Sequence, residues 1–283
     1  MAKPVLSAQI THREDLNDTL AIFRFELEGG VPDFTPGQFV TLGIPHPDPE
    51  KEGKMLWRAY SIASAPSTKE HLELYIRWAR KPIDGLFTTK LWEMKVGDTL
   101  KQRGITGPFT VEDSLGDGSP DQRRLLLFGG GTGVAPFLSY AIEMQRKKVP
   151  RELVVLHGAS YIEELGYREE LIEMDRQTAD AGKDEFRLRY IASISRPKEE
   201  ANAGWDGEVG RVETLIQKQD GQEQSRLEEI LGEEVTRENS FCHVCGYGAT
   251  CKAVEEVLKP RGFRTRREKG EDGTYDMKVE SYG

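Results

Sequence analysis

The sequence predicts a two-domain protein, with an N-terminal antiparallel β-barrel followed by an α/β domain built on a parallel sheet. At 283 residues the chain is long enough for two domains that each bury a core. The first third has short strand-like segments separated by turn residues, which is typical of a barrel or sandwich. Beyond a polar, glycine-rich stretch at Asp113–Arg123, strands alternate with helical patterns. We therefore place the domains at residues 1–115 and 122–283.

Six strands and one helix are expected in the first domain. A Pro-Gly turn at Pro36-Gly37 marks the start of one of the strands. The expected strands are Val5–His12, Thr19–Leu27, a segment within Phe34–Leu42, Arg58–Ala63, Leu72–Trp78 and Thr99–Gln102, and the helix is Leu86–Met94.

The second domain alternates strands and helices, which predicts βαβ units and a parallel sheet with helices on both faces. The expected strands are Arg124–Phe128, Leu153–His157, Phe186–Ile194 and Phe241–Cys245. The expected helices begin near Leu138, at Tyr167 and at Thr250. Because Gln217–Asn239 is highly charged, we interpret it as a surface helix or an insertion.

The composition is that of a soluble globular protein, with 37% hydrophobic and 31% charged residues. A net charge of −9 argues against a nucleic-acid partner, since phosphate backbones select for a basic face. Met1–Asp15 has no apolar run of signal-peptide length, and no later stretch approaches a membrane span. We therefore expect a cytoplasmic protein, and we expect a monomer.

Two local basic clusters stand out on this acidic chain. Each is either solvated surface or a docking site for a small acidic partner. A docking site is possible on an acidic chain because the local electrostatic field, rather than the net charge, guides the approach of a charged partner. The clusters are Arg261, Arg264, Arg266, Arg267 and Lys269, and Arg77, Arg80 and Lys81.

Three cysteines, Cys242, Cys245 and Cys251, fall within ten residues. Their spacing allows a metal site with His243 as a fourth ligand. However, His243 and Cys242 are adjacent in an expected strand, so their side chains point to opposite faces. We favour three free thiols in a reducing compartment and expect no metal.

Two motifs carry the chemistry. Arg58-Ala59-Tyr60-Ser61 offers a guanidinium for a pyrophosphate, a flat aromatic ring and a hydroxyl. Gly129–Pro136 is a small-residue turn between a strand and a helix, where backbone N–H groups can hold an anionic cofactor. Val134 occupies the third glycine position of the dinucleotide fingerprint, and no Lys-Ser or Lys-Thr follows, so the turn matches neither common nucleotide template.

In this order, the motifs resemble the ferredoxin–NADP reductase superfamily, and within it the bacterial-type ferredoxin (flavodoxin)–NADP reductases. The resemblance covers nearly the whole chain. It rests on Pro36–Phe39, Arg58–Ser61, Gly85–Thr88, Gly107–Phe109, the G-T-G-x-x-P turn at Gly131–Pro136, Val244–Gly246 and Val279–Tyr282.

The resemblance implies that FAD binds to the first domain. Arg58 would bind the flavin pyrophosphate, Tyr60 would lie along the isoalloxazine ring and Ser61 would lie near flavin N5, with Ala59 between them. Gly85, Leu86, Phe87 and Thr88 would form a second pyrophosphate clamp. The flanking strand would contribute Tyr75, Ile76, Arg77 and Trp78.

The resemblance also implies that NADP(H) binds to the second domain. Gly131, Thr132, Gly133 and Pro136 would form its turn, and Cys245 and Gly246 would lie beside the nicotinamide. Arg196 and Arg211 match positions that hold the 2′-phosphate, whereas Ser160, after Ala159, replaces an arginine found in close relatives. Tyr282 matches a C-terminal aromatic that covers the flavin in some members, here on a tail that ends at Gly283.

The implied activity is that of an FAD-dependent oxidoreductase exchanging electrons between NADP(H) and ferredoxin or flavodoxin, a small acidic carrier. Hydride transfer at flavin N5 would involve Ser61, Tyr60 and Cys245 as catalytic residues. One alternative is a reductase component that feeds an oxygenase or another acceptor. A different class would be a thiol or metal sensor built on the three cysteines, which would purify colourless rather than yellow.

Overall fold

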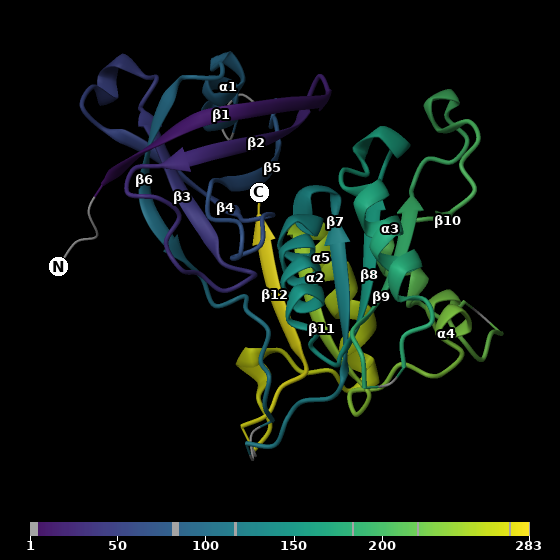
Figure 1. Cartoon of the computed structure of the whole chain (residues 1–283). Coiled ribbons are helices and arrows are strands. Elements are labelled where there is room, and N and C mark those ends of the chain that lie inside the picture. The colour runs from purple at the N-terminus through teal and green to yellow at the C-terminus, as the bar shows by residue number, and fades with distance from the viewer. Residues whose placement is uncertain are drawn as a thin grey trace. The chain divides into compact units, whose positions relative to one another are not determined.

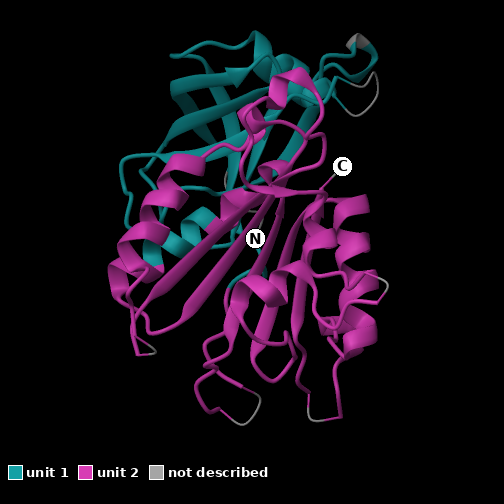
Figure 2. Ribbon diagram, turned by 90° about the vertical axis from the view of Figure 1, so that its right-hand side faces the viewer, with its two compact units in different colours: residues 1–110, 138–143 teal, residues 111–137, 144–283 magenta. Residues whose placement is uncertain are grey.

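The computed structural model describes residues 5–80, 85–115, 118–182, 184–219, 221–271 and 273–282. It divides into two compact units, shown in separate colours in Figure 2. The first comprises Met1–Thr110 with Leu138–Glu143, and the second comprises Val111–Phe137 with Met144–Gly283. Lys81, Gly283, and Gly116 and Asp117 of the expected linker lie outside the described residues.

The first unit is a six-stranded antiparallel sheet of order β4-β3-β6-β1-β2-β5 (Figure 1). Its two edges meet, because Ile62 forms an antiparallel bridge with Leu74 and the Ala63 N–H donates to the Glu73 carbonyl at 2.8 Å. This closure makes the sheet a barrel, as predicted. The strands are β1 (Leu6–Asn17), β2 (Leu20–Leu27), β3 (Phe39–Pro45), β4 (Met55–Ser61), β5 (Leu72–Arg77) and β6 (Thr99–Thr106).

Helix α1 (Leu86–Glu93) adds to the barrel core. Phe87 and Leu91 are fully buried and share one hydrophobic cluster with Phe23 and Leu74 of the strands. Burial of these side chains fixes the start of α1 on the barrel.

The second unit is a six-stranded parallel sheet of order β10-β9-β8-β7-β11-β12 (Figure 1). Its strands are β7 (Arg124–Gly130), β8 (Glu152–Ala159), β9 (Arg187–Ile194), β10 (Glu208–Val209), β11 (Ser240–Tyr247) and β12 (Met277–Tyr282). Its helices are α3 (Arg168–Thr178), α4 (Arg226–Leu231), α5 (Gly248–Leu258) and the two ends of α2 (Ala135–Lys147), whose middle, Leu138–Glu143, belongs to the first unit. Short 3₁₀ turns are η1 (Pro49–Lys51), η2 (Gly131–Val134), η3 (Ile162–Glu164), η4 (Glu200–Asn202), η5 (Val212–Leu215), η6 (Lys259–Arg261) and η7 (Arg266–Glu268).

The order of the parallel strands locates a ligand-binding edge. From β7 the chain moves outward through β8 and β9, then returns to place β11 and β12 on the other side of β7. Right-handed crossovers therefore put α3 on one face of the sheet and α5 on the opposite face. The reversal between β7 and β11 creates a topological switch point, where ligands bind beyond the carboxyl ends of the strands.

The structure adds detail to two expectations for the second unit. The charged stretch Gln217–Asn239 is not only surface: Leu227 and Glu228 of α4 are 0% exposed. Four hydrogen bonds to the Glu228 carboxylate, from Ser225, Val235 and Arg261, make that burial possible. The expected tail at Val279–Tyr282 is a strand, since β12 pairs in parallel with β11.

Candidate functional site

The Arg58–Ser61 motif lies on β4, with Arg58 and Tyr60 on one side of the strand and Ala59 and Ser61 on the other. Arg58 is exposed, and one guanidinium N–H donates to the Trp57 carbonyl at 2.9 Å. The exposed guanidinium retains N–H groups that can bind a phosphate.

The ring of Tyr60 packs beside α1. It is half-buried, and its centroid lies 5.7 Å from that of Phe87 at an interplanar angle of 47°. Burial raises the pKa of the Tyr60 hydroxyl well above its usual range, against a smaller opposing effect of Arg58. Tyr60 therefore stays neutral and presents a flat ring rather than a charge.

The start of α1 differs from the predicted clamp in the role of Thr88. Its hydroxyl donates to the Gly85 carbonyl at 3.1 Å and accepts the Ala79 N–H at 3.1 Å. Thr88 and Phe87 are both buried. Any anion held at Gly85–Thr88 must therefore rely on backbone N–H groups of the first helical turn, which carry no side-chain cap.

The flanking strand contributes mostly packing. Tyr75 is 4% and Ile76 1% exposed, and Ile76 belongs to the barrel core. Trp78 stacks on Trp92 at 5.8 Å, and its indole N–H donates to Thr89 at 2.9 Å. Its ring is thus engaged with α1, while Arg77 is half-buried at the end of β5.

In the second unit, the glycine turn joins β7 to α2 through η2, with Pro136 in the first turn of α2. A Cβ on Gly133 would lie 2.1 Å from the carbonyl oxygen of Cys245, which leaves no room for a side chain. A Cβ on Gly246 would lie 3.3 Å from the Cα of Gly130. The structure therefore brings together the two predicted nucleotide motifs, the glycine turn and Cys245-Gly246, at the switch point.

Two carbonyl groups of this turn are held by side chains from other strands. The Tyr282 hydroxyl donates to the Gly130 carbonyl at 2.7 Å and accepts the Thr132 hydroxyl at 3.0 Å. His157 of β8 places Nε2 3.1 Å from the Gly131 carbonyl oxygen.

His157 is neutral, because burial lowers its pKa to about 4 against the opposing effect of the bond to Gly131. Since a carbonyl only accepts, Nε2 carries the proton, and Nδ1 accepts from the Tyr190 hydroxyl at 3.1 Å. Sequence reasoning missed both residues. The available signal was one histidine inside the apolar run Leu153–Leu156 and Gly158.

Cys245 is 1% exposed, so its thiol belongs to the wall of the turn and does not project into solvent. Cys242 and Cys251 are also buried thiols. Within the described part of the chain, no group of three or more His, Cys, Asp or Glu side chains is arranged to hold a metal ion.

The residues predicted near the 2′-phosphate lie beyond β8 and β9. The Ser160 N–H donates to the Glu164 carboxylate at 3.0 Å. Arg196 donates to the Tyr161 hydroxyl at 2.7 Å and lies 3.4 Å from Glu199, and these contacts, that with Tyr161 first, raise its pKa. Tyr161 in turn donates to Glu199 at 2.6 Å. Ala159 ends β8, and Arg211 is exposed just before η5.

Three comparisons place this geometry among known proteins. Residues 7–111 match the family model for the oxidoreductase FAD-binding domain, and residues 127–256 match that for the oxidoreductase NAD-binding domain. A ferredoxin–NADP reductase of Pseudomonas aeruginosa is 30% identical over 263 residues, covering 92% of this chain and 91% of the relative. A glycine betaine monooxygenase reductase subunit of Chromohalobacter salexigens is 29% identical over 231 residues, covering 81% of this chain but 53% of the relative.

Among solved structures, a ferredoxin NADP+ reductase from Neisseria gonorrhoeae with bound FAD and NADP superposes with a TM-score of 0.72 at 21% identity. The match covers 98% of both chains. These findings confirm the predicted resemblance and fold class. In addition, none of the described helices is both long and apolar enough to span a membrane.

Proposed function

Because the chain belongs to the ferredoxin–NADP reductase family, we propose that it uses FAD to exchange electrons between NADP(H) and a one-electron carrier, ferredoxin or flavodoxin. The observation that carries this proposal is the packing of Gly133 against Cys245, which builds a shelf of small residues at the switch point. When bound, the flavin converts a hydride into single-electron steps.

The first unit fits the flavin in its donors and in its shape. We assign the pyrophosphate to the exposed guanidinium of Arg58 and to the backbone amides that begin α1. Tyr60 supplies a neutral ring for stacking, and Ser61, at the end of β4, supplies the hydroxyl near the reacting atom. Ala59 and the strand Tyr75–Trp78 complete the wall.

The second unit fits the nucleotide. The turn Gly131–Pro136 brings backbone close to the ligand because a side chain at Gly133 is excluded. Cys245 and Gly246 form the other side of the shelf, and Thr132 with Tyr282 lies at its edge. We assign the 2′-phosphate to Arg196 and Arg211, near Ala159 and Ser160.

The role of Ser61 is tested by substitution. We expect Ser61→Ala to slow flavin reduction by NADPH in stopped-flow experiments more than it weakens NADP+ binding. Flavin reduction at an unchanged rate would reject the role of Ser61, while leaving the family activity in place.

The whole assignment is tested by purification and steady-state kinetics. The protein should purify yellow with a flavin spectrum and reduce ferredoxin with NADPH faster than with NADH. Equal rates with the two nucleotides would remove Arg196 and Arg211 from the 2′-phosphate site. A colourless protein that takes up no FAD would overturn the proposal and favour the sensor class.

A second candidate is a reductase component that feeds an oxygenase. The similarity to the glycine betaine monooxygenase reductase subunit supports it, although this chain spans 53% of that relative. Comparing electron transfer to ferredoxin, to flavodoxin and to an oxygenase component separates the two. With the three thiols reduced and buried, we infer a monomeric enzyme of the cytoplasm.

A further inference from the structure

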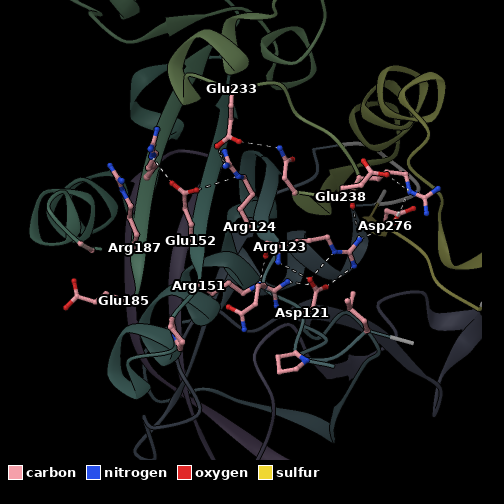
Figure 3. A pocket seen from close by; sticks show the side chains of 18 of the residues that line it. Asp121, Arg123, Arg124, Arg151, Glu152, Glu185, Arg187, Glu233, Glu238 and Asp276 are labelled. Carbon is pink, nitrogen blue, oxygen red and sulfur yellow. Dashed lines mark hydrogen bonds and ion pairs between the residues drawn. The ribbon is translucent and has the colours of Figure 1, made fainter. Parts of the chain in front are cut away.

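A pocket of about 1150 Å³ opens at the amino ends of β7, β8 and β9 (Figure 3). All of its lining residues belong to the second unit. The glycine turn follows the carboxyl end of β7, so the pocket lies at the opposite edge of the same sheet. None of the cofactor assignments above uses it.

The floor of the pocket is a row of charged side chains. Arg124, Glu152 and Arg187 are the first residues of β7, β8 and β9, and Glu152 lies beside Arg187 in the strand register. Arg189 follows two positions later on the same side of β9. Leu126, two positions after Arg124, belongs to the hydrophobic core on this face. The charged side chains therefore lie on the same face of the sheet as the hydrophobic core, at the edge formed by the amino ends of the strands.

Cations outnumber anions in this row. The Glu152 carboxylate lies 3.5 Å from Arg124 Nε and 2.9 Å from Arg189 Nε. Arg124 also pairs with Glu233 at the exposed rim. Glu152 is therefore shared by two guanidiniums, and within the described residues Arg187, its neighbour in the strand register, forms no ion pair with it.

Arg187 is left without a counter-ion. In the described chain no ion pair and no side-chain hydrogen bond reaches it, and its Nε is buried without a partner. The nearest acid in sequence, Glu185, accepts the Gly182 N–H at 2.8 Å, and its carboxylate points away from Arg187 in Figure 3. Arg187 is half-buried, and burying its charged Nε–H without an acceptor costs free energy that a bound anion would offset.

On the opposite wall, in contrast, the guanidiniums lie beside carboxylates. Arg151, whose side chain is 4% exposed, has Nη2 3.4 Å from the Asp121 carboxylate, buried and without a hydrogen bond. Asp121 also binds Arg123, which bridges to Asp276. Asp276 in turn lies 3.8 Å from Arg237. Asp276 also lies 3.3 Å from Arg264, and Arg237 lies 3.6 Å from Glu238, so the guanidiniums of this wall each have a counter-ion.

We propose that the pocket binds a small phosphate-bearing anion, with the Arg187 guanidinium as its principal ligand. A guanidinium fork matches two phosphate oxygens, and Arg187 has both its charge and its buried Nε available. The other guanidiniums that line the pocket lie beside carboxylates, so an entering anion meets the available positive charge at Arg187. The volume accommodates a phosphate ester as well as free phosphate.

Isothermal titration calorimetry with inorganic phosphate and with glycerol 2-phosphate tests this at constant ionic strength, with and without saturating NADP+. We expect one site whose affinity NADP+ does not change, and a loss of affinity of roughly tenfold or more in Arg187→Gln. Arg176→Gln, an exposed residue paired with Glu173 on α3, is the matched control and should not change binding. Tighter binding of the ester identifies a phosphorylated metabolite as the ligand, and equal binding identifies free phosphate.

Thermal unfolding gives an independent readout. Because Arg187→Gln removes a half-buried charge that has no counter-ion, it should raise the melting temperature of the anion-free protein and abolish the rise that phosphate produces. Arg187→Lys keeps the charge but loses the fork, so its phosphate affinity should lie between wild type and Gln. Unchanged phosphate affinity in Arg187→Gln, no saturable binding to wild type, or a lower melting temperature of the anion-free variant would each overturn the proposal.

Discussion

Replacing Gly133 by alanine tests whether hydride transfer depends on the packing of the glycine turn. The added Cβ would lie 2.1 Å from the Cys245 carbonyl oxygen and 2.5 Å from its carbonyl carbon, whereas ordinary contacts are 3.4–4 Å. Both obstructing atoms are backbone atoms of β11, so no side-chain rotation relieves the overlap. The turn and β11 must therefore separate by more than 1 Å.

That displacement sets the expected magnitude. Overpacking of this kind destabilises a protein by about 1–3 kcal/mol. A misplacement of about 1 Å in a reacting group slows a reaction by about 100-fold. Because β11 carries Cys245 and Gly246, we expect the rate constant of flavin reduction to fall by about this factor, with a smaller change in NADP+ affinity.

Stopped-flow reduction of the FAD-loaded protein by NADPH measures the rate, and urea unfolding measures stability. Gly248→Ala is the matched control, because a Cβ there meets nothing within 4 Å and the residue begins α5. Alanine in a helix is favoured over glycine, so this variant should be at least as stable as wild type. Flavin reduction by Gly133→Ala within twofold of wild type would refute the reasoning.

Three further outcomes follow from contacts in the second unit. Tyr190→Phe removes the donor to Nδ1 of buried His157 and should lower the free energy of unfolding at pH 7 by about 1–2 kcal/mol; an unchanged urea midpoint would contradict that bond. Glu199→Gln removes a carboxylate that competes with a 2′-phosphate for Arg196, so the NADPH-to-NADH ratio of kcat/KM should rise roughly threefold, and a fall would exclude the competition. Burial raises the pKa of Glu228, but its hydrogen bonds outweigh that effect and hold the pKa at about 2, below the ordinary 4.5. Its stabilisation, roughly 3 kcal/mol, is fully present above pH 4.5 and is lost as the pH falls toward 2, so Glu228→Gln should flatten the stability profile across that window.

Much of the fold follows from periodicity in the sequence. The strand at Leu153–His157 and the helix at Leu86–Met94 were located within a few residues, because one apolar face repeats at the period of the element. The helix α4 falls in the charged stretch where a surface helix was expected, but its buried side was not predicted, because a sequence pattern does not show whether the Glu228 carboxylate finds donors. β12 was missed because Met277–Tyr282 reads as a strand only when β11 is beside it.

Parts of the candidate site could not be predicted for a related reason. The glycines of the turn signal close approach, but the identity of the neighbour, Cys245, depends on the strand order. The hydroxyl of Thr88 is used to hold Gly85 and Ala79, a contact that a motif does not encode. His157 lies 26 residues from the carbonyl it binds, so only the assembled parallel sheet brings them together.

The side chains around the turn explain why small residues can form a precise shelf. Because glycine has no Cβ, a neighbouring strand or a ligand can come close to its backbone, but the same absence leaves the backbone free to adopt many conformations. Tyr282 from β12 and His157 from β8 restrain the two carbonyl groups that flank Gly131, whose φ of +55° is left-handed. Because His157 stays uncharged down to about pH 4, its Nδ1 accepts from Tyr190 throughout the neutral range, and that bond keeps the single ring proton on Nε2, facing the Gly131 carbonyl. Strands on both sides of β7 therefore supply the rigidity that the glycines lack, which the proposed nicotinamide site requires of its second-unit wall.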